Sequence, residues 1–184
     1  MAINSSSYNT LFITEAVLKD NSVINSNVDM KTITPTIKLC QDKYIMPLIG
    51  SSLYADLQFK ITSGSLNPDE VFLMKAYIQP VLVWAVMKES TLYTSFKYMN
   101  KGVSQQSSDN SNPVTLKDLQ YLADNQGNNL DWYSQRLIDY LQANKGLFTA
   151  YENETQSNDL KPANTGFKSR LYLGNGSKCC KEWK

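Results

Sequence analysis

The sequence predicts an all-α protein: an antiparallel helical bundle built on two long helices, with an extended N-terminal arm and a strand-like C-terminal tail. Residues 67–101 and 116–143 carry apolar side chains at steps of three and four, the spacing of one helix face. The two ends of the chain are polar and bury little by themselves. We therefore expect an N-terminal arm with a short helix at 1–33, a helical core domain at 34–151 and an extended tail at 152–184.

The first long helix is predicted from its start signals. Asn67 can accept a hydrogen bond from the first turn, Pro68 suits the first helical position, and Glu70 complements the positive end of the helix dipole. From Val71 to Met87 the only formal charge is Lys75. A helix this apolar is expected to be surrounded by other helices.

A membrane-spanning helix is the competing interpretation of this apolar run. A bilayer core needs roughly 20 apolar residues in a row, whereas Lys75, Gln79 and Pro80 interrupt the run. We favour a buried core helix and expect no membrane partner. Because Pro80 lacks an N–H and crowds the carbonyl of Ala76, we expect a bend near the middle of the helix.

Shorter helices are predicted before the central one. Thr14 begins a possible helix that ends at Lys19, after an apolar run that contains Phe12. We expect this arm to pack locally or onto a neighbouring subunit. Thr34 and Pro35 mark the start of a helix that ends at a glycine corner, Gly50, where Ser51 begins the next helix.

The second long helix could be continuous or broken near its middle. Thr115 with Asp118 resembles a capping box at its start. The polar stretch 124–129 favours a break by local propensity, but the apolar phase continues across it if Gly127 lies on the buried face. We favour one helix from Leu116 to Ala143, with Gly127 permitting close approach of a partner.

The segments that flank this helix are predicted to differ. Residues 100–113 are rich in Gly, Ser, Gln and Asn and indicate an exposed loop. After Asn144 to Gly146 end the helix, we expect Leu147, Phe148 and Tyr151 to fold back onto the core.

The C-terminal tail is basic and has a strand-like pattern, with apolar and polar or basic side chains alternating from residue 167 to residue 173. A lone strand in a helical domain must add to another stretch of the chain or to a neighbouring subunit. The residues expected to contact a subunit or partner are Phe12, Phe167, Arg170, Leu171, Tyr172 and Leu173.

Composition argues against most catalytic chemistry. Lys and Arg number 18 against 17 Asp and Glu, a formal net charge of +1, and there is no histidine. This removes Ser–His and Cys–His nucleophile pairs and His-ligated metals. The three cysteines, Cys40, Cys179 and Cys180, form no disulfide or zinc pattern and are expected to be reduced. We expect no metal, no cofactor, no enzymatic activity and no secretory signal.

One stretch resembles a known family. Residues 41–54, with the sequence QDKYIMPLIGSSLY, form a helix that ends in a Leu-x-Gly corner followed by Ser-x-Leu-Tyr, and residues 27–29, Ile33 and Ile37 upstream extend the likeness. Together with the pattern from Tyr133 to Leu141, this resembles the helical head–tail connector (adaptor) proteins of tailed bacteriophages, in the version of crAss-like and other Bacteroidetes phages.

The resemblance implies an all-helical virion protein without catalytic residues. Such subunits assemble in the host cytoplasm as a ring, commonly twelve-fold, beneath the portal protein. The ring contacts the tail or a second adaptor, extends the DNA channel and lets DNA pass without sequence-specific binding. Two alternatives stay open: a tail-completion or stopper protein, and a helical nucleic-acid-binding adaptor that uses the basic tail.

Overall fold

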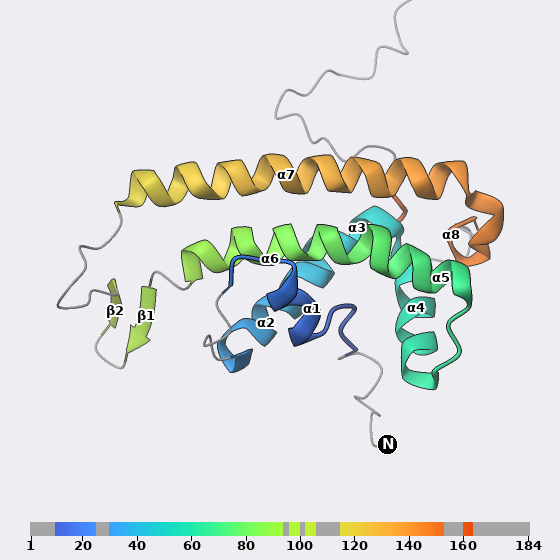
Figure 1. Cartoon of the computed structure of the whole chain (residues 1–184), viewed down its shortest axis with the longest axis horizontal. Coiled ribbons are helices and arrows are strands. Elements are labelled where there is room, and N and C mark those ends of the chain that lie inside the picture. The colour runs from blue at the N-terminus through green and yellow to red at the C-terminus, as the bar shows by residue number, and fades with distance from the viewer. Residues whose placement is uncertain are drawn as a thin grey trace, which may run out of the picture.

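Helices make up most of this computed structural model, which also contains one two-stranded hairpin (Figure 1). The coarse prediction of a mainly helical chain is therefore confirmed. The structure describes residues 10–24, 30–93, 96–99, 102–105, 115–152 and 160–163.

The central helix begins as predicted. It runs through α5 (Pro68–Leu73), a π turn η2 (Met74–Ile78) and α6 (Gln79–Tyr93). The side chain of Asn67 accepts from the N–H of Glu70 at 2.8 Å, and Glu70 returns a bond to the N–H of Asn67, which completes a capping box. The chain accommodates Pro80 through the π turn just before it, because the wider turn shifts the acceptor by one residue.

The second long helix, α7 (Leu116–Ala143), is continuous, so the predicted single helix is confirmed. It lies along α6 with the opposite chain direction (Figure 1). Gly127 is buried on the side facing α6, where a Cβ atom would lie 3.1 Å from the Nζ atom of Lys88. The absence of a side chain at Gly127 therefore lets the lysine pass between the helices.

The helices before α5 are α1 (Glu15–Asp20), α2 (Met30–Cys40), the π turn η1 (Gln41–Ile45), α3 (Met46–Ile49) and α4 (Ser51–Ser63). Thr14 caps α1 as predicted. The predicted start of α2 at Thr34 is wrong: the helix begins at Met30 and contains Pro35. Packing of α2 against α6 outweighs the proline signal. A second π turn, η1, ends two residues before Pro47, as η2 does before Pro80.

The predicted extension of the central helix to residue 101 is also wrong. The helix ends at Tyr93, and the chain forms an antiparallel hairpin of β1 (Phe96–Met99) and β2 (Gly102–Gln105), in which Phe96 pairs with Gln105 and Met99 with Gly102. Aromatic residues in β1 favour strand over helix here. The hairpin also occupies part of the stretch predicted as an exposed loop.

After α7, the chain folds back through the 3-10 turn η3 (Lys145–Leu147) and α8 (Thr149–Glu152). Phe148 and Tyr151 are buried, as predicted, whereas Leu147 is 52% exposed and does not join the core. Its place in the 3-10 turn directs it away from the buried side.

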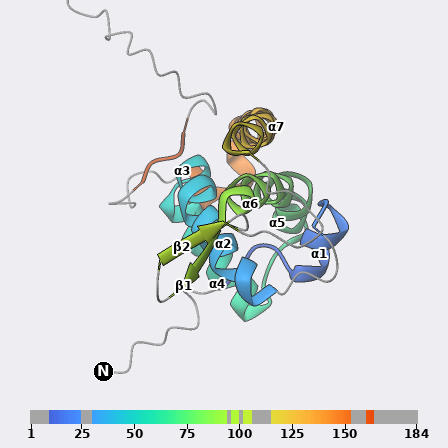
Figure 2. The same ribbon diagram turned by 90° about the vertical axis from the view of Figure 1, so that its left-hand side faces the viewer.

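The core surrounds α6. In the end view, α7 lies on one side of α6, and α1, α2 and α4 lie on the other (Figure 2). The stretch Pro68–Thr91 is long and apolar enough to cross a membrane by length and composition, but half of it is buried inside the protein. Contacts with α2 and α7 account for that burial and support a core helix. The largest fully buried side chains are Ile13, Leu18, Ile37, Ile45, Ile49, Leu53, Leu57, Leu73, Ile78, Leu82, Leu137 and Ile138.

Candidate assembly interface

Phe12 lies inside the chain's own core and is not available for the subunit contact predicted for it. It is 2% exposed, and its ring lies 5.2 Å from that of Tyr54. The buried amide of Gln41 holds the backbone around it: Gln41 Oε1 accepts from the N–H of Phe12 at 2.9 Å, and Nε2 donates to the carbonyl of Thr10 at 3.0 Å. The arm belongs to the core because its apolar run has this buried polar partner.

The other predicted contact residues lie outside the described part of the chain. They are Phe167, Arg170, Leu171, Tyr172 and Leu173, and the predicted strand-like pattern lies there as well.

Part of the predicted tail does have a place on its own chain. Residues 160–163, here called the strap, return to the glycine corner between α3 and α4. The N–H of Ser51 donates to the carbonyl of Leu160 at 3.0 Å, and the N–H of Ala163 donates to the carbonyl of Pro47 at 3.1 Å. The strap thereby satisfies a donor at the first turn of α4 and an acceptor near the end of α3.

Gly50 makes this docking possible. Its φ of 81° and ψ of 154° lie in a region that essentially only glycine adopts. A Cβ atom there would lie 2.9 Å from the ring of Pro162. Gly50 was predicted only as a corner between two helices, and the structure shows that the strap also packs against it.

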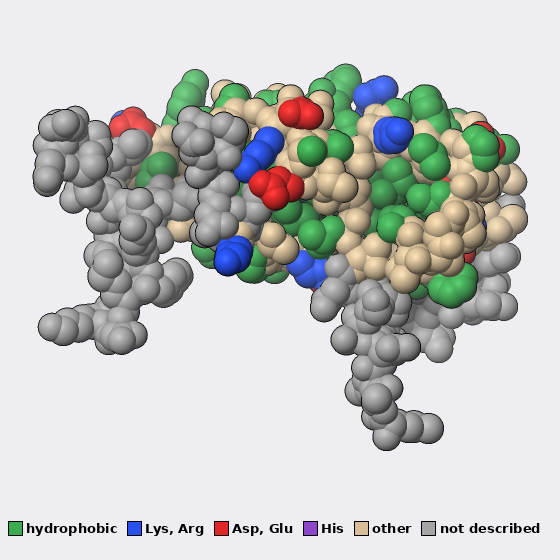
Figure 3. All heavy atoms as spheres, turned by 60° about the horizontal axis from the view of Figure 1, so that its bottom comes forward, with side chains coloured by type: hydrophobic (Ala, Val, Ile, Leu, Met, Phe, Trp, Pro, Cys, Tyr) green, Lys and Arg blue, Asp and Glu red, His purple; other side chains and the backbone are tan. Residues whose placement is uncertain are grey.

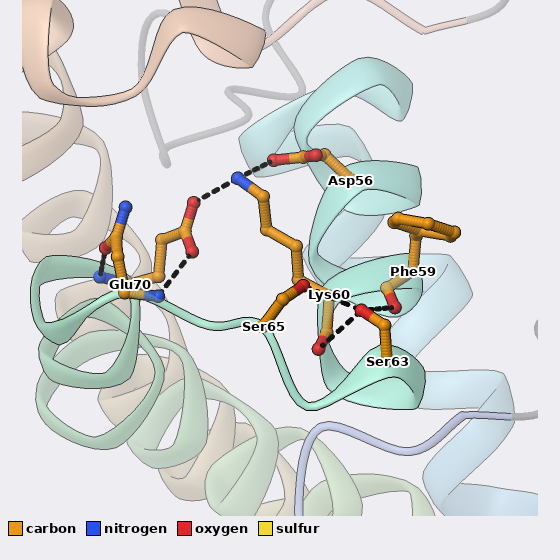
Figure 4. A network of polar contacts seen from close by, with 7 residues as sticks. Asp56, Phe59, Lys60, Ser63, Ser65 and Glu70 are labelled. Carbon is orange, nitrogen blue, oxygen red and sulfur yellow. Dashed lines mark hydrogen bonds and ion pairs between the residues drawn. The ribbon is translucent and has the colours of Figure 1, made fainter.

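A network around Lys60 ties α4 to α5 (Figure 4). The Lys60 ammonium lies 2.7 Å from Asp56 and 2.5 Å from Glu70. The hydrogen bonds that the ammonium donates to Asp56 and Glu70 raise the pKa of Lys60. Since Glu70 also closes the capping box at Asn67, the network fixes the angle between two helices.

A second polar group joins η1 to α6. Glu89 is 11% exposed and accepts from the ammonium of Lys43 at 2.6 Å and from the hydroxyl of Tyr44 at 2.5 Å. Burial by itself would raise the pKa of Glu89, but these two donors outweigh it and lower the pKa. The hydrogen bond to Glu89 raises the pKa of Lys43 to about 12.

Catalytic or metal chemistry has little support in the described ranges. Burial raises the pKa of the Cys40 thiol to about 12, so the group stays protonated at neutral pH. Within those ranges, no group of three or more Cys, Asp or Glu side chains could hold a metal ion. An open pocket of about 220 Å³ lies between α1, α6 and α7, with Trp84, Tyr133 and Lys75 among its lining residues.

Aromatic side chains join the central helix to α7. The rings of Tyr77 and Tyr140 stack at 4.0 Å, and the guanidinium of Arg136 lies 4.7 Å above Tyr77. Further along α7, the ring of Tyr133 stacks on Trp84 with 6.4 Å between centroids. It also meets the ring of Trp132 edge-on at 4.8 Å. These contacts anchor the inner face of α7, and the last of them reaches the exposed Trp132.

The outward side of α7 carries large exposed side chains. Tyr121 is 75% exposed and Trp132 is 61% exposed, and no other described element covers this side of the helix (Figures 1 and 2). The exposed residues that follow one another at steps of three and four, with one longer step at the end, are here called the α7 stripe. They are Asp118, Tyr121, Asn125, Asn128, Trp132 and Asp139.

A family model for proteins of unknown function, DUF6712, matches residues 45–161. The chain belongs to this family. No curated protein matches it, and no solved structure does.

The DUF6712 region begins in η1 and ends within the strap. It therefore contains the glycine corner, both long helices and the α7 stripe, and it leaves out the whole N-terminal arm, α2 and the residues after 161. The stripe was missed from the sequence because Tyr121 and Trp132 lie among the Asn and Asp residues that were weighed only as helix breakers. Their spacing of 11 residues, three helical turns, was the available signal.

Charge is not concentrated on the side of this DUF6712 protein that faces away from α7. Figure 3 shows a few acidic and basic side chains of both signs, scattered among hydrophobic and uncharged ones. By contrast, α7 contains four aspartates and only two basic residues, Lys117 and Arg136. The long helix is thus acidic as well as aromatic on its exposed side.

Proposed function

We propose that this DUF6712 protein is a structural virion protein, a head–tail connector that forms a ring beneath the portal protein. The ring joins the DNA-filled head to the tail, extends the DNA channel and contacts the tail or a second adaptor. The proposal assigns the protein to the virion, after assembly in the host cytoplasm, and gives it no catalytic activity, cofactor, metal or membrane.

The observation that carries the proposal is the α7 stripe. Exposed aromatic residues are enriched at protein interfaces, where they contribute much of the binding energy. Tyr121 and Trp132 lie opposite the buried face of a 28-residue helix, so they contribute little to the core. A face of this kind needs a partner to bury it.

The resemblance to connector proteins supports the same function. It rests on the corner that ends at Gly50, and this corner is a rigid feature of the fold: a π turn, a short helix, a glycine with positive φ and the docked strap. A rigid corner suits a subunit whose neighbours must meet at one repeated angle.

The finer architecture belongs to the proposal. We infer an antiparallel bundle centred on α6 and α7, with residues after the strap reaching a neighbouring subunit or the portal as a strand-like tail. Such a ring repeats one heterologous interface, commonly twelve times. A near-neutral channel would let DNA pass without retaining it.

The mass of the purified protein, measured alone and with its portal protein, tests the proposal. We expect a closed ring of fixed copy number in at least one of the two conditions. The double variant Tyr121→Ala with Trp132→Ala should weaken assembly, whereas Phe59→Ala, which removes a ring that is 65% exposed on α4, should not. A single-copy mass in both conditions would contradict the proposed ring.

A nucleic-acid-binding adaptor is the second candidate, favoured by the basic residues that follow the strap. Those residues are Lys168, Arg170, Lys178, Lys181 and Lys184. This function predicts DNA binding that weakens steeply as salt rises. Removing the residues after Ala163, which keeps the strap, separates the candidates: loss of ring assembly or portal docking supports the connector, and loss of DNA binding alone supports the adaptor. A stopper or tail-completion protein would form a ring but dock onto the connector rather than the portal.

A further inference from the structure

The exposed side of α7 is the most acidic surface on a long element of the described chain. Its aspartates, Asp118, Asp124, Asp131 and Asp139, are all exposed. Of the two basic residues on α7, Arg136 lies over the ring of Tyr77 and so turns toward the central helix. The other, Lys117, is exposed beside Asp118, so four carboxylates and one ammonium border the aromatic residues of the stripe.

The residues that follow the strap have the opposite charge. Five of the 18 basic residues, but only one of the 17 acidic ones, lie after Ala163. The same segment contains Phe167, Tyr172 and Trp183. A basic and aromatic chain complements an acidic and aromatic face, both through charge and through contacts of Arg or Lys with aromatic rings.

The length of this segment and its starting point fit a contact with another copy. The 21 residues after Ala163 span up to roughly 70 Å when extended. The stripe from Asp118 to Asp139 is roughly 32 Å long at the rise of an α-helix. The segment starts where the strap ends, beside α3, whereas the stripe faces away from the rest of the protein (Figure 2).

We propose that the α7 stripe binds residues 164–184 of a neighbouring copy of this chain. The inference rests on the proposed ring, in which each subunit offers one basic segment and one acidic face. Each contact then joins unlike surfaces of two copies, as a head-to-tail ring requires. Trp132 and Tyr121 supply the apolar contact area, and the aspartates orient the incoming segment.

Charge reversal in the full-length protein tests this contact. The stripe-reversed variant carries Asp139→Lys in the stripe and Asp131→Lys beside it, and the segment-reversed variant carries Lys168→Glu and Arg170→Glu. Each variant alone should raise the concentration needed for assembly about tenfold or more, because attraction becomes repulsion at every interface. An equimolar mixture of the two should assemble nearly as well as the unchanged protein, since each reversed stripe then meets a reversed segment.

Controls separate this effect from misfolding and from total charge. Both variants should keep the helical circular dichroism signal of the unchanged protein; for the stripe-reversed variant this is expected because Asp131 and Asp139 are exposed. Asp20→Lys on α1 changes a charge on another face and should leave the assembly concentration within about twofold, as expected for an exposed site outside the interface.

The outcomes distinguish this contact from the ring itself. If all four substitutions in one chain restore assembly but the mixture does not, the segment binds its own α7 and the inference fails. If neither reversal changes assembly, or if segment reversal removes only DNA binding, the inference also fails while the ring stands. If the unchanged protein stays single with and without its portal, the proposed function fails first.

Discussion

The N-terminal arm and the strap both attach to the core, but through different chemistry. Side chains hold the arm: Phe12 is buried against Tyr54, and the amide of Gln41 bonds the backbone beside it. Backbone groups hold the strap, which docks where Gly50 has no side chain. The comparison shows that a polar, irregular segment can be part of a domain either by filling a pocket or by completing a helix end.

Phe12→Ala tests the attachment of the arm through its side chains and should have the largest effect on stability. Truncating a fully buried aromatic ring should lower the free energy of unfolding by about 3–5 kcal/mol, because the cavity closes only in part. Phe59→Ala, at an exposed position of α4, should change it by about 0.5 kcal/mol or less. Equilibrium denaturation measures both, and equal losses would mean that the arm is not anchored through Phe12.

Gly50→Ala tests the attachment through the backbone. The new Cβ would be strained at a φ of 81° and would collide with the ring of Pro162. We expect a loss of about 2–3 kcal/mol, together with faster hydrogen exchange at the N–H of Ser51 as the strap lifts.

Gly64→Ala is the matched control for Gly50→Ala. It also has a positive φ, 68°, but no atom lies within 4 Å of its added Cβ. The expected loss is therefore limited to conformational strain of about 1 kcal/mol. If both variants lose the same amount, the strap contributes nothing at Gly50.

Glu89→Gln tests the polar contact of α6 with Lys43 and Tyr44 in η1. We expect the free energy of unfolding to fall by about 1–2 kcal/mol at pH 7, after allowance for the 52% exposure of Lys43. Because the folded pKa of Glu89 is lowered from 4.5, its contribution is present above that value and is lost as the pH falls through the folded pKa. Lys43 loses its part as the pH rises from 10.5 through about 12. Denaturation as a function of pH should show the variant and the unchanged protein converging in acid.

Gly127→Ala should have the smallest effect. Its Cβ would meet only the flexible end of Lys88, which can move by a few tenths of an ångström. The gain in helix propensity is about 1 kcal/mol, so we expect a stabilisation of up to that amount. A clear loss in thermal denaturation would show that Lys88 is fixed between α6 and α7.

Local signals predicted the helices well where one stretch of chain carried the information. The Asn67 and Glu70 capping box and the continuous α7 with buried Gly127 follow from spacing and side-chain chemistry. The strap could not be predicted, because it depends on a contact between Ser51 and Leu160, 109 residues apart, that involves backbone atoms. Leu160 to Ala163 has no periodicity that would indicate a docking segment.

The sequence was a weaker guide to the candidate interface. Phe12 was predicted to contact a neighbour because the arm is polar on average, yet its short apolar run fills the core. Tyr121 and Trp132 were not predicted, because helical spacing identifies the buried face but not whether the opposite face is covered as well. The α7 stripe became visible only once the position of α6 was known.

The strap brings two distant points of the chain together, since Pro47 and Ala163 are joined by a hydrogen bond. The stretch of chain between these two residues therefore begins and ends at the same place in the structure. The part of the chain before Pro47 and the part after Ala163 are therefore connected to this region at a single site beside Gly50.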